Sequence, residues 1–592
     1  MPFVAFLYVT YAAPRPFHAA EDDPEHNTYY NARLLSAGQP IYQLAHPGTP
    51  VYYGAFLIMT VVGHAPDRVQ HFFTICRLLW SVLTAFSLGF FGWLCLRRLP
   101  VGVSALAVSL LLTWPSFLLY IDYFDPNCLT VAFGLPTIAL FWSGLRDDGG
   151  LSFWGLLACG LGLGLCLATK LTFLPVAFAM IVTVVLRTWR SSSPDPRACA
   201  RLLSMPIGMA LSFACLNAPI LGRLPILIIN TIEHPEAAVG RDALKALLRA
   251  WTALQDASLL LAIVTLVTAG AFVWVTLIRS GDPTPASRES TLAEVRMDTG
   301  RLDLTGAGVF LSLMLCGMVY TMAGAGGIVE PAPPGHTLRN VHPTALALPF
   351  VVIYIYERSR RRWMLGRVWG RVASAALVLT GGLVVVSAVG TRIEGREAFI
   401  QAHATLAEQT QKRLETLREP NTRVAVWDGS PGSLMGPPSF HFWGNYWYAH
   451  DYFDRELAET YPHFVFFRLR EVPNLIRGRQ DSLEPAGADT SAVPATPDSW
   501  FGWAARRIGR RAWRRTFPEP YGPRTDEVVA NEWSGERVSI LAFPEDEEVA
   551  ELRGWGITES DFLSFVQGRF GTPILWRESI GGVAWVLVRF RG

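Results

Sequence analysis

The chain has 592 residues, of which 51% are hydrophobic and only 17% are charged, and its mean hydropathy is +0.27. Soluble domains carry about 25% charged residues, so this composition excludes a disordered chain, a fibrous repeat and an ordinary cytosolic enzyme. A formal net charge of +2 is too small to indicate a nucleic-acid partner. The composition fits a polytopic membrane protein with a soluble part attached.

Apolar runs long enough to cross a bilayer define the membrane part. A transmembrane helix needs ~20 mostly apolar residues. The sequence predicts eleven spans, at 1–12, 73–96, 101–121, 126–145, 151–168, 171–188, 202–221, 257–278, 304–324, 342–357 and 367–390. The run at 52–65 is too short to span and is predicted to be a helix that lies along the interface.

The distribution of arginine gives the predicted orientation. With eleven spans and a cytoplasmic N-terminus, the arginine-rich connections all fall on the cytoplasmic side, as the positive-inside rule requires. The first span lacks a cleavage pattern and is expected to be retained. The arginine bias and the short first span suggest a bacterial inner-membrane protein. Its first external loop, 13–72, and its C-terminal part would then face the periplasm.

The chain is thus predicted to have two domains, a transmembrane domain at 1–390 and an extracytoplasmic domain at 391–592. The second is long enough for a core of its own. It alternates helical runs with strand-like runs, at 424–428, 463–469, 537–543 and 582–590. We therefore expect a polytopic α-helical membrane protein that carries a C-terminal α/β domain.

Carboxylates gather in the first external loop and at a later junction of two spans. Asp22 and Asp23 belong to an acidic cluster directly after the first span. In water such a cluster is simply a solvated loop, whereas against a membrane it suggests a general base or a cation site. Asp122 and Asp125 lie at another outside junction. Asp125 precedes Pro126 and suits a helix cap, which leaves Asp122 unexplained.

Two basic side chains also lie at predicted outside ends of spans. Lys170 is one of only three lysines and lies in a long apolar stretch. A lysine there costs several kcal/mol unless it snorkels or meets an anion. Arg339 precedes a span and could either hold a phosphate through two hydrogen bonds or anchor the helix end to headgroups. The glycines at 160, 162 and 164 suit close helix packing.

These residues carry a resemblance to a known family. In their order and predicted topology, residues 1–390 resemble the GT-C glycosyltransferases, in particular the family of protein O-mannosyltransferases and lipid A aminoarabinose transferases. The matching motifs are Asp22-Asp23-Pro24, Tyr29-Tyr30, His46-Pro47-Gly48, Asp125-Pro126, Ala168-Thr169-Lys170, and Arg339 with Pro349. Two positions depart from the family pattern: Asp23 stands where Glu is usual, and His46 where Lys is common.

The resemblance implies inverting transfer of a sugar from a polyprenyl-phosphate donor on the extracytoplasmic face. Asp22 would be the general base, with Asp23 as second choice. Lys170 and Arg339 would bind the departing phosphate. The remaining expected substrate-binding residues are Asp122, Asp125, His46, Tyr29, Glu233 and His234. A divalent cation, Mg²⁺ or Mn²⁺, at Asp22, Asp23 and Asp122 stays open, because some GT-C enzymes need one and others do not.

Other functions remain as alternatives. A transporter would use intramembrane Asp and Lys for ion coupling, but the charged residues lie at one predicted face and no internal repeat is visible. A non-catalytic receptor or assembly subunit would tolerate neutralisation of Asp22 and Asp125. Within the enzyme interpretation, lipopolysaccharide or another cell-envelope glycan is the expected acceptor by analogy, alongside contacts with membrane lipids.

Overall fold

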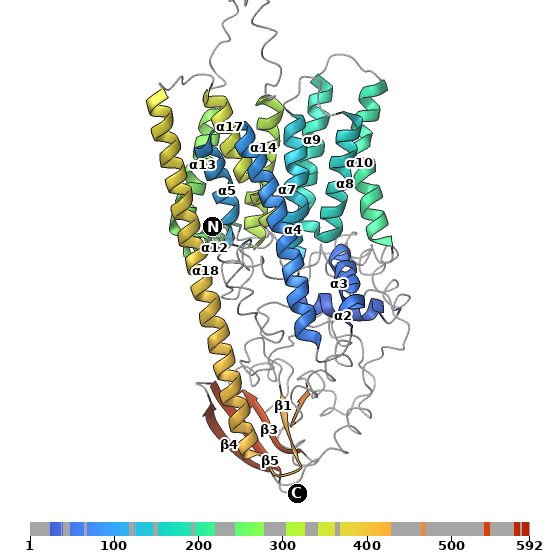
Figure 1. Cartoon of the computed structure of the whole chain (residues 1–592), viewed down its shortest axis with the longest axis vertical. Coiled ribbons are helices and arrows are strands. Elements are labelled where there is room, and N and C mark those ends of the chain that lie inside the picture. Colours follow the sequence, from blue (N-terminus) through green and yellow to red (C-terminus); the bar gives the residue numbers. More distant parts are fainter. Residues whose placement is uncertain are drawn as a thin grey trace, which may run out of the picture. The chain divides into compact units, whose positions relative to one another are not determined.

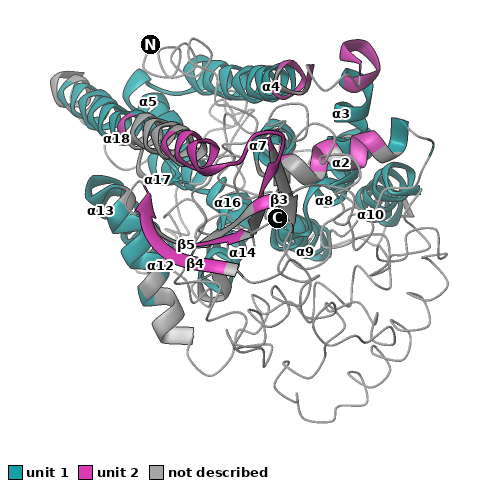
Figure 2. Cartoon of the chain, turned by 90° about the horizontal axis from the view of Figure 1, so that it is seen from below, with its two compact units in different colours: residues 1–12, 34–58, 74–393 teal, residues 13–33, 59–73, 394–592 magenta. Residues whose placement is uncertain are grey.

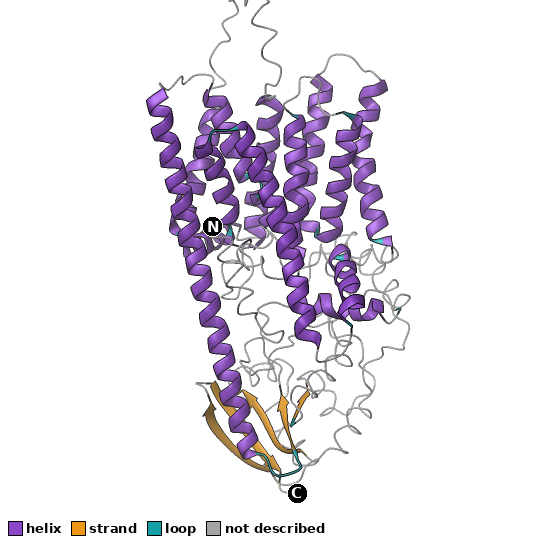
Figure 3. Ribbon diagram, in the orientation of Figure 1, coloured by secondary structure: helices purple, strands orange, loops and turns teal. Residues whose placement is uncertain are grey.

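The computed structural model is predominantly helical, and among the residues it describes strands occur only in the C-terminal part of the chain (Figures 1 and 3). The structure describes residues 24–36, 38, 48–63, 68–115, 117, 124, 126–145, 152–190, 196–218, 243–277, 304–325, 341–360, 367–427, 463–467, 538–544, 573–580 and 583–590. The predicted first span, 1–12, lies outside these residues.

Helices occupy the apolar runs of the sequence. Their bounds are α2 Pro24–Ser36, α3 Thr49–Val62, α4 Val69–Arg98, α5 Val101–Leu112, α7 Pro126–Gly144, α8 Phe153–Thr169, the 3-10 turn η2 Leu171–Phe173, α9 Leu174–Arg190, α10 Pro196–Leu216, α12 Ala243–Ala257, α13 Leu259–Leu277, α14 Leu304–Ala325, α16 His342–Ala345, α17 Leu348–Arg360 and α18 Arg367–Leu417. Each of the ten predicted spans from 73–96 onward contains a helix, and the run at 52–65 forms most of α3.

Several of these helices are long and apolar enough to cross a membrane. Among the described residues, 5 helices meet both conditions, at 71–98, 171–189, 199–216, 259–276 and 374–391. Shorter apolar helices lie at 49–62, 101–112, 128–144, 153–169 and 306–322. The protein is therefore a membrane-embedded helical protein.

Proline and residue composition explain where helix bounds differ from the predicted spans. In the span predicted at 101–121, helix α5 ends at Leu112, shortly before Pro115, and residues 118–121 lie outside the described residues. Proline disfavours helical geometry in the residue that precedes it. The span predicted at 342–357 is divided into α16 and α17, and Pro349, which has no N–H to donate, lies at the second position of α17. In contrast, α18 continues to Leu417 through residues of high helix propensity.

Helices α8 and α10 pack closely through glycine. A Cβ atom at Gly160 would clash with the carbonyl oxygen of Met205, and one at Gly208 would lie 2.6 Å from the carbonyl oxygen of Leu157. Glycine lets two helix backbones approach in this way. Gly162 faces Thr137 of α7 with equally little room. The close packing predicted from the glycines at 160, 162 and 164 is confirmed.

The chain divides into two compact units (Figure 2). The helical unit comprises residues 1–12, 34–58 and 74–393, and the sheet unit comprises residues 13–33, 59–73 and 394–592. In the helical unit, a core of buried aliphatic and aromatic side chains is contributed by helices from α4 to α18. Examples are Phe91 of α4, Phe141 of α7 and Phe350 of α17.

The sheet unit contains five strands, β1 Arg423–Trp427, β2 Phe464–Phe467, β3 Val538–Pro544, β4 Pro573–Ile580 and β5 Val583–Phe590. Their order is β2-β1-β3-β5-β4. Strand β1 pairs in parallel with β2 and β3, whereas β5 pairs antiparallel with β3 and β4. The four runs predicted as strands are β1, β2, β3 and β5, and β4 was not predicted.

The C-terminal turns of α18 pack onto this sheet. Leu414 is fully buried, and the guanidinium of Arg589 donates to the carbonyl oxygen of Leu417 over 3.2 Å. The hydroxyl of Thr422 bonds that of Ser539 on β3 at 2.7 Å. A helix that covers one face of the sheet supplies the second layer that a small α/β unit needs.

Candidate functional site

The structure describes two of the ten site residues predicted from the sequence, Tyr29 and Lys170. The others lie outside the described residues; they are Asp22, Asp23, His46, Asp122, Asp125, Glu233, His234 and Arg339. The candidate site is therefore built from Lys170 and from the groups that the fold brings to it.

Tyr29 lies on α2 in the sheet unit and is 2% exposed. Its ring contacts Phe72 edge-on, with centroids 5.2 Å apart, and lies 5.6 Å from the ring of Phe73. The guanidinium of Arg33 lies over the same ring. An aromatic cluster of this kind fixes α2 against the start of α4.

Lys170 ends α8 and separates it from the 3-10 turn η2. Its backbone is extended, with φ −155° and ψ 125°, while its N–H still donates to the carbonyl oxygen of Cys166 over 2.8 Å. Only 3% of the residue is exposed. The last carbonyl groups of a helix carry partial negative charge, so the position favours a cation. Unlike a snorkelling lysine, Lys170 is enclosed by protein.

His342 lies beside Lys170, although the two are far apart in the sequence. It begins α16, which contacts η2, the turn that directly follows Lys170. His342 is 1% exposed, and within the described part of the chain neither ring nitrogen has a hydrogen-bond partner. The ring of Phe117 contacts it edge-on at a centroid distance of 6.2 Å. A buried imidazole with two unused nitrogens can still bond a bound group.

The loop predicted to be external also reaches this end of the helices, through Gly48. The N–H of Gly48 donates to the carbonyl oxygen of Thr169 over 3.3 Å. Gly48 has φ 55°, a left-handed conformation that glycine adopts readily, and a Cβ there would lie 2.6 Å from the hydroxyl of Tyr52. The predicted motif His46-Pro47-Gly48 therefore ends directly against the turn that carries Lys170.

A buried hydrogen bond holds the loop in place. The hydroxyl of Thr49 donates to Oδ1 of Asn217 over 2.6 Å, and Nδ2 of Asn217 donates to the carbonyl oxygen of Phe213 over 3.0 Å. Thr49 and Asn217 are both completely buried. Together these bonds connect the start of α3 to the end of α10, next to the end of α8.

Sequence reasoning gave no role to Asn217 and His342 of this region, or to Trp114 of the helical core. Trp114 is 1% exposed, and its indole N–H has no partner among the described residues. The available signal was that each is a polar or amphipathic residue inside an apolar segment, where such residues are costly and often functional. That signal identifies the residues but does not predict which other residues they contact.

The residues expected to bind a metal are all acidic. Within the described ranges, no three His, Cys, Asp or Glu side chains gather as a metal site. The expected ligands Asp22, Asp23 and Asp122 lie outside those ranges. No chemical step is therefore derived through a metal.

The geometry defines a buried polar site at one end of the helices of a membrane-embedded protein. A buried cation and an imidazole whose two nitrogens have no partner among the described residues can receive an anionic group such as a phosphate. No protein-family model matches the chain, and no curated protein is similar to it. Its function must therefore be argued from these residues.

Proposed function

We propose that the protein is an inverting glycosyltransferase that moves a sugar from a polyprenyl-phosphate donor to an extracytoplasmic acceptor, a lipopolysaccharide or another cell-envelope glycan. One observation carries the proposal. Lys170 is buried beside His342, and the first external loop ends at the same turn through Gly48. A buried positive site next to that loop suits a lipid-linked phosphate.

The reaction needs a base on the acceptor and a positive site for the leaving group. Asp22 takes the proton of an acceptor hydroxyl, with Asp23 as the second candidate. The hydroxyl oxygen attacks the anomeric carbon from the face opposite the phosphate, so the C–O bond to phosphate breaks as the new glycosidic bond forms. The polyprenyl phosphate leaves with the bonding electron pair. Lys170, Arg339 and His342 stabilise its growing charge.

The other predicted residues orient the substrates. Asp122 and Asp125 would hold sugar hydroxyls, and His46, which precedes the loop turn at Gly48, would contact the donor. Glu233 and His234 would line the acceptor side, and Tyr29 would support the loop from α2. A divalent cation bound by the acidic residues would help to neutralise the phosphate, but the mechanism assigns no step to it.

The topology is part of the proposal: eleven spans, with the site and the C-terminal unit in the periplasm of a bacterium. Two arginine contacts support this orientation. Arg98 reaches Ser143 and Arg187 reaches the carbonyl oxygen of Gly144, so both lie at the C-terminal end of α7. α16, which carries His342, contacts the same helix. The positive-inside rule would place these two arginines at the cytoplasmic face and Lys170 at the other face.

The test is turnover of a panel of polyprenyl-phosphate sugars by the purified protein, with and without cell-envelope extract. Mass spectrometry would follow loss of the donor. Asp22→Asn should reduce turnover by about 100-fold or more, because a positioned base contributes at least that much. Asp256→Asn, at an exposed position on α12, is the matched control and should leave turnover unchanged.

Two results would contradict the proposal. If Asp22→Asn turns over the donor at the wild-type rate, the base is another residue, and Asp23→Asn is the next variant. If the folded wild type neither binds nor consumes any polyprenyl-phosphate sugar, a transporter or a non-catalytic receptor becomes the better interpretation.

A further inference from the structure

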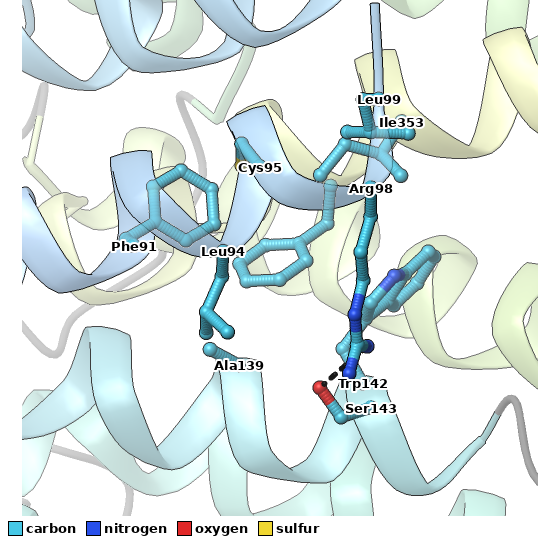
Figure 4. A pocket seen from close by; sticks show the side chains of 10 residues that line it. Phe91, Leu94, Cys95, Arg98, Leu99, Ala139, Trp142, Ser143 and Ile353 are labelled. Carbon is cyan, nitrogen blue, oxygen red and sulfur yellow. Dashed lines mark hydrogen bonds between the residues drawn. The ribbon is translucent and has the colours of Figure 1, made fainter.

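A second site lies between α4, α7 and α17 of the helical unit, at the end of α7 that carries Ser143 (Figure 4). The pocket is a small, partly open hollow with a cavity volume of about 30 Å³. Most of its wall is apolar. It is lined by Phe91, Leu94, Cys95, Leu99, Ala139, Trp142, Phe350 and Ile353, with Arg98 and Ser143 as the polar side chains.

Arg98 gives the pocket a positive charge. Its side chain is exposed and runs alongside Trp142, and one guanidinium nitrogen donates to the hydroxyl of Ser143 over 3.4 Å (Figure 4). Within the described part of the chain, Arg98 contacts no carboxylate. Trp142 is 4% exposed, and its indole N–H likewise has no hydrogen-bond partner there. Among the described residues, the guanidinium of Arg98 therefore keeps N–H groups that have no protein acceptor.

The surroundings of the pocket have the character of a membrane–water interface. Trp93 on α4 is 51% exposed, stacks on Phe90, and carries the guanidinium of Arg97 over its ring. Exposed tryptophan next to arginine is typical of the headgroup level of a bilayer. Arg187 bonds the end of α7 nearby, and Arg358 bonds Tyr354 on α17. The open side of the pocket thus lies where apolar surface gives way to basic surface.

We propose that this pocket binds an anionic phospholipid of the surrounding leaflet. The phosphodiester would accept hydrogen bonds from Arg98, and the upper part of an acyl chain would lie over the open edge of the hollow, against the half-buried Leu94. Basic pockets between transmembrane helices bind anionic headgroups in this way. The inference depends on membrane embedding and on this pocket, not on the proposed glycosyltransferase activity.

The apolar wall favours a lipid over a free anion. Inorganic phosphate would use Arg98 and Ser143 but would leave Leu94, the half-buried apolar side chain at the open edge of the pocket, uncovered. A phospholipid covers that side chain and also supplies the charge, so both features of the pocket are used. A zwitterionic lipid would use the wall but would bring a cationic group towards the arginines.

Native mass spectrometry of the full chain in detergent can test this. Phosphatidylglycerol would be titrated onto the wild type, with phosphatidylcholine as the neutral comparison. Arg98→Gln should weaken phosphatidylglycerol binding about fivefold, since one arginine at a membrane surface contributes about that factor. Arg97→Gln is the matched control, because Arg97 neighbours Arg98 and is equally exposed but does not line the pocket.

A second variant tests the apolar wall without altering charge. Leu94→Trp should fill the pocket and also weaken phosphatidylglycerol binding, whereas Leu96→Trp, on the exposed face of α4, should not. Equal weakening by Arg98→Gln and Arg97→Gln would overturn the proposal in favour of a general surface charge. The proposal would also be overturned if the wild type bound phosphatidylcholine as tightly as phosphatidylglycerol, or if inorganic phosphate displaced the lipid.

Discussion

The helical unit and the sheet unit differ in how far they remove charged side chains from water. In the helical unit, Lys170 is only 3% exposed and lies beside the buried His342. In the sheet unit, Arg413 and Glu578 form a two-pronged ion pair while their side chains stay 45% and 25% exposed. A charge removed from water costs several kcal/mol unless something compensates it, whereas an exposed pair contributes at most about 1 kcal/mol. Replacing the charged residue Lys170 by a neutral one therefore tests function, whereas replacing Arg413 tests little more than local stability.

The two units also differ in what holds them together. The helical unit depends on backbones that approach across glycine, as at Gly160 and Gly208. The sheet unit depends on strand pairs and on the end of α18 that covers them. Because the helices leave no free space at these glycines, the addition of one methyl group there should lower the stability more than the loss of a surface ion pair.

The largest expected effect comes from Lys170→Met, which keeps an unbranched, buried side chain but removes the charge. If Lys170 stabilises the departing phosphate, kcat for donor turnover should fall about 100-fold or more. Lys412→Met, on an exposed position of α18, is the matched control and should keep wild-type turnover. Steady-state kinetics on protein that elutes as a single species would separate kcat from KM. Unchanged kcat in both variants would remove Lys170 from the mechanism.

An intermediate effect is expected from Gly160→Ala. The added Cβ meets the backbone of Met205 and cannot be accommodated by a rotamer change, so the variant should lose about 1–3 kcal/mol of stability. Gly270→Ala on α13 is the matched control, since a Cβ there meets nothing within 4 Å. It should gain about 0.5–1 kcal/mol through better helix propensity. Thermal unfolding in detergent would compare them, and equal melting temperatures would contradict the close packing of α8 and α10.

The smallest effect is expected from Arg413→Gln in the sheet unit. The hydrogen bond from Arg413 lowers the pKa of Glu578, and the indole N–H of Trp576 lowers it further, against a smaller opposing effect of burial. A lowered pKa in the folded state means that the pair stabilises above the ordinary glutamate pKa and that this contribution is lost as pH falls through the lowered value. At neutral pH the variant should lose less than about 1 kcal/mol.

Hydrogen exchange of the segment 573–590 in the full chain would measure this small change. The difference between wild type and Arg413→Gln should be present at pH 7 and should shrink in acid, where Glu578 is protonated in both. A difference that grows in acid would show that the pair does not act through the carboxylate.

Much of the fold could be predicted from local sequence patterns. Apolar runs predicted helices such as α7, α8 and α14, and Pro115 explains why α5 stops early. Alternating and β-branched runs predicted β1, β2, β3 and β5, while β4, in PILWRESI, was missed because its charged residues weaken the pattern. The candidate site was predicted only in part, since Lys170 was recognised but Asn217 and His342 received no role.

The sequence by itself determined that this is a helical membrane protein with a C-terminal sheet, because hydropathy and helix hydrogen bonds are local properties of the chain. Only the tertiary structure decided the neighbours. Helix α16, which carries His342, contacts the turn that follows Lys170. Thr49 bonds Asn217, and Arg98 bonds Ser143. Each of these contacts joins segments that are distant in the sequence. So does the strand order β2-β1-β3-β5-β4. Such pairings depend on how whole surfaces fit together, and no residue pattern within one segment specifies its partner.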